Sequence, residues 1–145
     1  MGTTGAARER PLVLIDTCIW IYHFSGDARF GNKVSRLLRR IERGEWEGIV
    51  SEISLLEILV QPLRLGRQEV ADTYELVLER FPHLEICGIG REETLSAAAL
   101  RARYGLRTPD ALILATGLNR GATLALTQDH QWRRIREIEV RTLDE

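Results

Sequence analysis

The sequence has few cysteines and no long apolar run, and each shortage excludes a class of protein. Cys18 and Cys87 are its only cysteines, which is too few for a disulfide framework. Neither lies near a second Cys or a His pair, so a structural zinc site is not expected, and we interpret both as small buried hydrophobic residues. No stretch approaches the roughly 20 apolar residues that span a bilayer, and the first residues lack the apolar run of a signal peptide. We therefore expect a cytoplasmic protein without a membrane segment.

The chain also lacks an excess of positive charge. Its net charge is −1 and its pI is near 6.3, so no global basic field points to nucleic acid. Any binding to nucleic acid must then depend on local patches. Lys33 is the only lysine, and the remaining positive charge belongs to arginine, which makes bidentate phosphate contacts better than lysine does. A GC-rich genome would produce the same arginine usage, so the bias alone assigns no function.

The length of 145 residues suits one domain, because it is enough to bury one core and too little for two. A hydrophobic fraction of 44% and a charged fraction of 28% are typical of globular proteins. Residues 1–10 are small and polar without periodicity, which predicts a flexible N-terminal tail. Residues 11–145 are then a single folded domain.

Short apolar runs alternate with helical patterns along this domain. The runs predict five strands, at residues 12–15, 48–51, 84–87, 123–126 and 138–141. The patterns predict helices at residues 33–43, 53–60, 67–81, 91–104, 108–119 and 128–135. A connector is expected around residues 25–27, and Pro62 is expected to end the second helix. This alternation predicts an α/β fold, a three-layer α/β/α sandwich around a mainly parallel sheet of about five strands.

Acidic residues stand where such a fold would bring them together. Asp16 directly follows the first strand, and Asp129 follows the fourth strand just after Thr127. Asp110 lies in the first turn of a helix, and Glu57 lies in the helix that follows the second strand. Ligands of parallel sheets bind beyond the carboxyl ends of the strands, so four carboxylates can converge there. Carboxylates this close repel one another unless they share a cation, and hard oxygen ligands suit Mg²⁺ or Mn²⁺.

Each acid also has a purely structural interpretation. Asp16 would cap the turn after the first strand, and Glu57 would complete a capping box that begins at Ser54. Asp110 would interact with the dipole of its helix, and Asp129 would be an ordinary residue of a surface loop. Taken one at a time, the four acids therefore leave structure and function open.

Four segments that contain these acids resemble the acidic motifs of one enzyme family. LIDTCIWI, SEISLLEIL, TPDALILATGL and LALTQDHQW are similar to the four motifs of the PIN-domain ribonucleases, in the same order. The similarity is closest to the small VapC-type toxins of toxin–antitoxin pairs, and it covers almost the whole chain from Leu12 onwards. TPDALILATGL is the most specific of the four segments.

The resemblance implies a fold, an activity and a set of site residues. It implies a PIN-like fold and a metal-dependent endoribonuclease that uses Mg²⁺ or Mn²⁺, as the toxin of a type II toxin–antitoxin system. Partners would be an RNA substrate, a cognate VapB-like antitoxin and a second copy of the chain in a homodimer. Thr127 would support the site with its hydroxyl and Thr17 would do likewise, whereas Cys18 stands where the family often has Asn. The implied metal ligands, which are also the catalytic residues, are Asp16, Glu57, Asp110 and Asp129.

Two other functions remain open at this stage. The chain could be a housekeeping PIN nuclease in RNA maturation, or a catalytically silent module that binds RNA or protein. Candidate contacts to an RNA backbone are the arginines that flank Asp110 and Asp129, namely Arg101, Arg103, Arg107, Arg133, Arg134 and Arg136. Aromatic residues would either stack on bases or fill the core, namely Trp20, Tyr22, Trp46 and Trp132. No histidine is needed as a base, although His130 adjoins Asp129.

Overall fold

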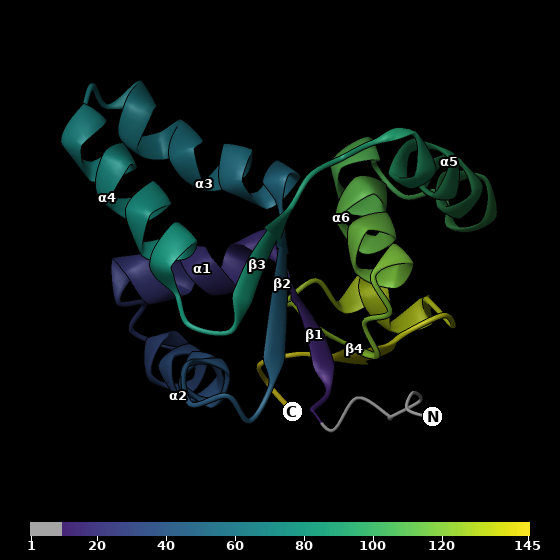
Figure 1. Cartoon of the computed structure of the whole chain (residues 1–145), viewed down its shortest axis with the longest axis horizontal. Helices are drawn as coiled ribbons and strands as arrows, with labels where there is room; N and C mark the ends of the chain where they lie inside the picture. The colour runs from purple at the N-terminus through teal and green to yellow at the C-terminus, as the bar shows by residue number, and fades with distance from the viewer. Residues whose placement is uncertain (1–9) are drawn as a thin grey trace, which may run out of the picture.

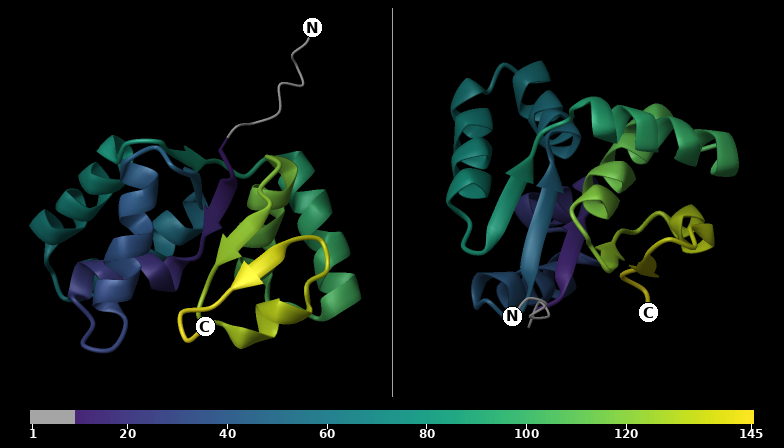
Figure 2. Two further views of the ribbon diagram at one scale, coloured as in Figure 1. Left: turned by 90° about the horizontal axis from the view of Figure 1, so that it is seen from below. Right: turned by 45° about the vertical axis from the view of Figure 1, so that its right-hand side comes forward.

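A computed structural model describes residues 10–145, and a five-stranded sheet lies at its centre. All neighbouring strands pair in parallel, in the order β3-β2-β1-β4-β5. In the left view of Figure 2 the arrows of the last two strands lie side by side and point the same way. The strands are β1 (Leu12–Ile15), β2 (Glu47–Ser51), β3 (Leu84–Cys87), β4 (Leu124–Leu126) and β5 (Glu139–Arg141).

Helices cover both faces of this sheet, as Figure 1 shows. They are α1 (Thr17–Ser25), α2 (Gly31–Glu42), α3 (Glu52–Arg64), α4 (Gln68–Arg80), α5 (Arg91–Tyr104) and α6 (Thr108–Asn119). A short 3₁₀ helix, η1 (His130–Arg134), precedes the last strand. The helices α1 to α4 gather on one side of the sheet, and α5 and α6 lie on the other. The predicted three-layer α/β/α fold with a parallel five-stranded sheet is confirmed.

The alternation of side chains along β1 divides the core into two halves. Val13 and Ile15 pack in the cluster that includes buried residues of α1, α2 and α4. Leu12 and Leu14 pack in the cluster formed with α5 and α6. Because all four side chains of this strand are buried, its sequence is a continuous apolar run rather than an alternating one.

A close contact between α6 and β1 explains a glycine in the middle of that helix. A Cβ added at Gly117 would lie 2.8 Å from Cδ2 and 3.0 Å from Cβ of Leu14, which is fully buried. Glycine therefore lets the helix lie directly on the central strand. This contact holds the helix whose first turn carries Asp110.

The helix α1 was not predicted. Its sequence, TCIWIYHFS, is rich in β-branched and aromatic residues, which favour strands, and shows no polar face at helical spacing. The helix is nevertheless formed because it packs against α2 and α3 and buries Ile19 and Trp20 completely. Tertiary contacts thus override local preference, and the Asp16 carboxylate caps the helix by accepting a hydrogen bond from the Thr17 backbone N–H at 2.8 Å.

Three further details differ from the prediction. Pro62 does not end α3, which continues to Arg64, because a proline near the last turn removes a single backbone hydrogen bond. The helix begins with Ser51 as its cap, so Ser54 does not start a capping box. The last predicted helix is the shorter 3₁₀ helix η1, with Asp129 as its cap.

Most of the candidate stacking residues belong to the core. Trp20, Trp46 and Trp132 are buried, so they are unavailable to bases, whereas Tyr22 is only half-buried. Cys87 is buried as expected, but Cys18 is partly exposed. Of the predicted tail, residues 1–9 lie outside the described part, and Arg10 pairs with Glu47 at 2.7 Å. Between residues 10 and 145, no helix is both long and apolar enough to cross a membrane.

Candidate metal centre

The four predicted ligands line a single pocket beyond the carboxyl ends of the central strands. The next strand along the chain after β1 is β2, which pairs with one edge of β1, whereas β4 pairs with its other edge. The strand order therefore reverses between β1 and β4. Just beyond these ends, the Asp16 backbone N–H donates to the Leu126 carbonyl at 3.0 Å. The pocket has a volume of about 440 Å³. The residues that line it include Asp16, Glu57, Asp110 and Asp129.

Asp16 is the most buried of the four acids, with 8% of its surface exposed. Burial, with a smaller contribution from the negative charges of Asp110 and Glu57, raises the pKa of this carboxyl to about 6. Hydrogen bonds from the Thr127 hydroxyl and the Thr17 backbone N–H lower it in part. The carboxylate is thus held in place by these two donors and, more weakly, by the Cys18 thiol at 3.8 Å, yet its negative charge is poorly compensated.

Thr127 connects the two acids that follow β1 and β4. Its hydroxyl donates to the Asp16 Oδ2 at 2.7 Å and accepts the Asp129 backbone N–H at 3.0 Å. The side chain is fully buried, so its rotamer is fixed by packing. The supporting role that the resemblance implies for Thr127 therefore has a geometric basis in these two bonds.

Glu57 reaches the pocket from the first half of α3. The Thr17 hydroxyl donates to the Glu57 Oε1 at 2.6 Å and also lies 2.8 Å from the Ser54 Oγ. A hydroxyl has only one proton to give, so Ser54 must be the donor in the second contact. Ser54 is fully buried, and it orients Thr17, which in turn orients the carboxylate.

Asp110 lies in the first turn of α6, directly after Pro109. Pro109 fits there because the first backbone N–H groups of a helix have no partner within the helix. Burial raises the pKa of Asp110, and the negative charges of Asp129 and Glu57 act in the same direction. The guanidinium of Arg107 opposes this effect, with its Nε 3.3 Å from the Asp110 Oδ2.

Asp129 caps the 3₁₀ helix η1 by accepting the Gln131 backbone N–H on its Oδ1 at 3.0 Å. The capping role considered for Asp16 is thus real, and Asp129, considered only as an ordinary loop residue, is also a cap; both carboxylates still line the pocket. A cap occupies one carboxylate oxygen and leaves the other oxygen of Asp129 available. Capping therefore positions these side chains and does not compete with binding a cation.

The chemistry of the donor set fits a hard divalent cation. Within residues 10–145 no three Asp, Glu, His or Cys side chains are already drawn together as a group of metal ligands. The carboxylates instead accept hydrogen bonds from the threonine hydroxyls, from backbone N–H groups and from Arg107. This is expected because like charges repel one another. All four nevertheless border one pocket with oxygen donors only, which suits Mg²⁺ or Mn²⁺ better than softer metals.

Ile21 and Gln128 were not singled out from the sequence, Tyr22 was named only as a candidate for stacking on bases, and Cys18 was assigned to the core. Ile21, Tyr22 and Gln128 complete the lining, and the helical spacing of Cys18, Ile21 and Tyr22 would have grouped them had α1 been predicted. Burial raises the pKa of Cys18 to about 12, so its thiol remains protonated and adds no negative charge to the site. His23, His83 and His130 do not line the pocket.

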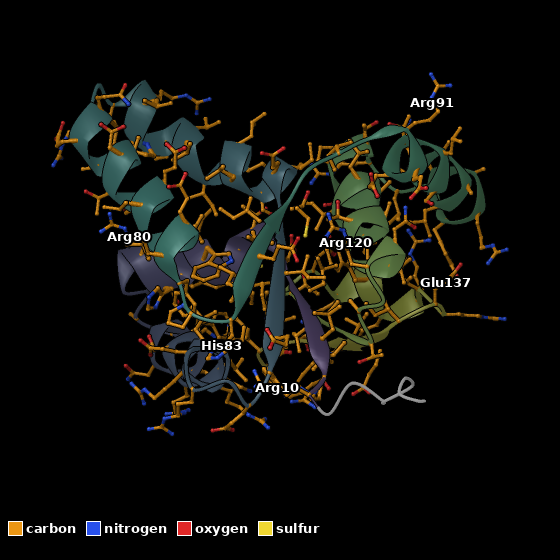
Figure 3. All side chains as sticks on the ribbon, viewed as in Figure 1. Arg10, Arg80, His83, Arg91, Arg120 and Glu137 are labelled. Atoms are coloured by element: carbon orange, nitrogen blue, oxygen red, sulfur yellow. The ribbon has the colours of Figure 1, made fainter. Side chains whose placement is uncertain are left out.

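The candidate RNA-binding arginines separate into different roles. Arg107 lines the acidic pocket. Arg103 pairs with Glu137, which Figure 3 labels at the right of the view below α5, and Arg133 pairs with Glu145. Arg101 donates from its Nε to the Leu106 carbonyl at 2.7 Å and so fixes the loop before α6. Arg134 and Arg136 do not line the pocket.

The sequence and the fold match known proteins. The family model described as PIN domain matches residues 13–138. A toxin–antitoxin complex from Klebsiella pneumoniae contains a chain of similar fold, 24% identical over 88% of this chain and 94% of that one, with a TM-score of 0.68. In VapBC2 from Rickettsia felis, bound to a DNA fragment from its promoter, a chain is 16% identical over 90% of this chain and 98% of that one (TM-score 0.74).

A third structure, FitAcB from Neisseria gonorrhoeae, is 17% identical over 89% of this chain and 95% of that chain, with a TM-score of 0.66. At these identities the likeness to solved structures concerns the fold. No curated protein sequence matches the chain significantly.

Proposed function

The chain belongs to the PIN domain family, and on that basis we propose that it is a Mg²⁺- or Mn²⁺-dependent endoribonuclease, the toxin of a type II toxin–antitoxin pair. The observation that carries this proposal is that all four acidic positions of the family line one pocket at the switch point of the sheet. None of the four acids is replaced, which argues against a catalytically silent module. The toxin–antitoxin complexes among the similar solved structures favour a toxin over a housekeeping nuclease.

Asp16, Glu57, Asp110 and Asp129 would hold the cation. A divalent ion bound there would lower the pKa of bound water and would neutralise the charge that develops on the phosphate oxygens. The Thr127 hydroxyl donates to Asp16, and the Thr17 hydroxyl donates to Glu57. Both hydroxyls orient carboxylates that would otherwise turn away from one another. Residues that hydrogen-bond to metal ligands usually have this role.

A second, apolar cavity beside the acidic pocket supports the proposal of an antitoxin partner. It has a volume of about 370 Å³, lies among α1, α3 and α4, and shares Ile21 and Glu57 with the acidic pocket. Phe24 and Tyr74 stack on each other with centroids 4.2 Å apart and line the cavity. A VapB-like segment that buries apolar side chains here would also cover the acids.

An exposed apolar stripe on α3 supports the proposal of a homodimer. Leu56 and Leu63 are 59% and 46% exposed, and Val60 lies between them at helical spacing. An unpaired stripe of this kind on a small domain is typical of an interface. Size-exclusion chromatography with light scattering should report a dimer, and Leu56→Glu should shift it to a monomer. A wild-type monomer at micromolar concentration would contradict this part.

The activity is tested with structured RNA in Mn²⁺, in Mg²⁺ and in EDTA. Asp110→Asn removes one proposed ligand, and Asp72→Asn is a matched control because Asp72 lies on the exposed surface of α4. We expect cleavage by wild type and by Asp72→Asn only when a divalent ion is present, and no cleavage by Asp110→Asn. Equal cleavage by all three proteins would show a contaminating nuclease and overturn the assignment.

The toxin role has a separate test. The product of a short reading frame next to the gene should co-purify with the chain and suppress its cleavage of RNA. Variants Phe24→Ala and Tyr74→Ala should weaken that complex without abolishing cleavage by the free enzyme. If the co-purified protein left cleavage undiminished, the antitoxin proposal would fail while the nuclease proposal stood.

A further inference from the structure

Arg107 is the only basic side chain among the residues that line the acidic pocket. It stands at the cap position before α6, where its backbone is extended and its carbonyl accepts the Ala111 N–H at 3.0 Å. The preceding loop is fixed by the bond from Arg101 to the Leu106 carbonyl. The backbone of Arg107 is therefore held firmly while its side chain projects over the first turn of the helix.

The contact between Arg107 and Asp110 is one that a competitor can break. Only the Nε reaches the Asp110 Oδ2, at 3.3 Å, although a guanidinium can offer two parallel donors to a carboxylate. The arginine side chain is 77% exposed, whereas that of Asp110 is 15% exposed. Water screens such a pair, so it adds little stability and is readily exchanged.

Five other arginines in ion pairs have closer carboxylate partners away from the pocket, whereas the pairs of Arg133 and Arg141 are longer. Arg120, labelled in Figure 3, is the clearest example, because it lies at the opposite end of the same helix and reaches the Glu85 Oε2 at 2.7 Å. The two arginines flank the helix 13 positions apart, so they are separated by roughly 20 Å along its axis. Arg107 is thus distinguished by its position at the acidic pocket.

We propose that Arg107 is a tethered cation that competes with the divalent ion for Asp110 and, once displaced, donates to a phosphate group of the RNA. A guanidinium held at the Asp110 Oδ2 repels a divalent ion that approaches the same carboxylate, because both are cations. The displaced guanidinium keeps its planar set of N–H donors, which matches the geometry of phosphate oxygens. This inference rests on the proposed nuclease function, and it assigns one residue to the substrate at the mouth of that site.

The exchange couples the two ligands. Because metal binding frees Arg107, the ion should increase affinity for RNA, and by thermodynamic reciprocity RNA should increase affinity for the ion. A merely structural ion pair would instead stabilise the first turn of α6 and leave both affinities unchanged when removed. These two interpretations predict different behaviour for the same variant.

The test compares wild type with Arg107→Gln and with the matched control Arg120→Gln. Mn²⁺ binding is measured by isothermal titration calorimetry without RNA. Binding of a fluorescein-labelled single-stranded RNA is measured by anisotropy in Ca²⁺ across a range of KCl concentrations. For Arg107→Gln we expect Mn²⁺ affinity to rise about 2- to 5-fold, because a weak competitor is lost. We expect its RNA affinity to fall, with the salt slope reduced by about 1.

Arg120→Gln should leave both measurements at their wild-type values. The proposal is overturned if Mn²⁺ affinity does not rise in Arg107→Gln, or if the salt slope for RNA does not change. Absence of RNA cleavage in Mn²⁺ would instead refute the nuclease function, and the two binding measurements would still decide the role of Arg107.

Discussion

The hydroxyl of Thr127 lies 2.7 Å from the Asp16 Oδ2, although 111 positions separate the two residues in the chain. The contact joins the carboxyl ends of β1 and β4, which pair in parallel at the centre of the sheet. Because the same hydroxyl accepts the Asp129 backbone N–H, one small side chain sets the relative position of two proposed metal ligands.

Replacing this hydroxyl should damage the site more than the fold. Thr127→Val keeps the shape but removes a donor to the buried Asp16 and an acceptor for Asp129, at a cost of about 1–3 kcal/mol in the free energy of unfolding. Mn²⁺ affinity should fall roughly 10- to 100-fold, as is usual when a group that hydrogen-bonds to a metal ligand is lost. Urea unfolding and calorimetric Mn²⁺ titration measure the two effects. Thr127→Ser should restore most of both, and a serine variant as impaired as valine would contradict the hydrogen-bond explanation.

The sequence predicted the strands better than it predicted α1, the helix that follows the first strand. The strand at residues 12–15 was recognisable because burial on both faces requires a continuous apolar run. The helix α1 was missed because apolar residues also occupy its exposed side, where Ile21 is 44% exposed, so no polar face marks the helical spacing. Pro62 was misjudged because the penalty of a proline depends on its distance from the helix end.

For the site, the sequence indicated which residue types would meet, but not how they are held. The positions of Asp16 and Asp129 follow from the strand that precedes each residue. The bond of Thr17 to Glu57 and the approach of Arg107 to Asp110 depend on how α1, α3 and α6 are oriented over the sheet edge. Such orientations are set by packing across the whole core, and no local pattern encodes them.

Asp16→Asn should stabilise the protein in EDTA at neutral pH. The folded carboxyl has a pKa of about 6 against an ordinary value of 3.8, so the folded state binds the proton more tightly than the unfolded state does. Between these pH values stability therefore falls as pH rises, and the cost is complete above about pH 6. The difference corresponds to about 3 kcal/mol, an upper bound on what the asparagine variant gains.

Urea unfolding of Asp16→Asn and wild type in EDTA, at several pH values from 4 to 8, measures this gain. The difference in the free energy of unfolding should be near zero at pH 4 and largest above pH 6. Added Mn²⁺ should reverse the order, because the ion stabilises only the protein that binds it. A difference that stayed constant with pH would mean that the Asp16 charge is not its cause.

Gly117→Ala should destabilise the fold even though alanine favours helices. A helix gains roughly 1 kcal/mol from such a change, but here the new Cβ would overlap the buried Leu14, and overpacking costs about 1–3 kcal/mol. Thermal unfolding should therefore show a lower midpoint. In the double variant with Leu14→Val the loss should be smaller than the sum of the two single losses, because the shorter side chain relieves the contact. Additive losses would place the strain elsewhere.

The chain of hydroxyls behind Glu57 allows a last prediction that separates stability from function. Thr17→Val removes the donor to Glu57 and also leaves the buried Ser54 hydroxyl without its partner. We expect a loss of about 1–3 kcal/mol in the free energy of unfolding, together with a roughly 10- to 100-fold loss in Mn²⁺ affinity. Denaturant unfolding in EDTA and calorimetric titration give the two values independently.

Adding Ser54→Ala to Thr17→Val should then recover part of the stability without recovering the affinity for Mn²⁺. The double variant leaves no hydroxyl buried and unpaired, so part of the unfolding free energy returns, as it does when both partners of a buried hydrogen bond are replaced by apolar groups. Glu57 still lacks its donor, so Mn²⁺ affinity should stay at the level of Thr17→Val. Recovery of Mn²⁺ affinity in step with stability would mean that Thr17 acts only by stabilising the fold, and its orienting role towards Glu57 would have to be abandoned.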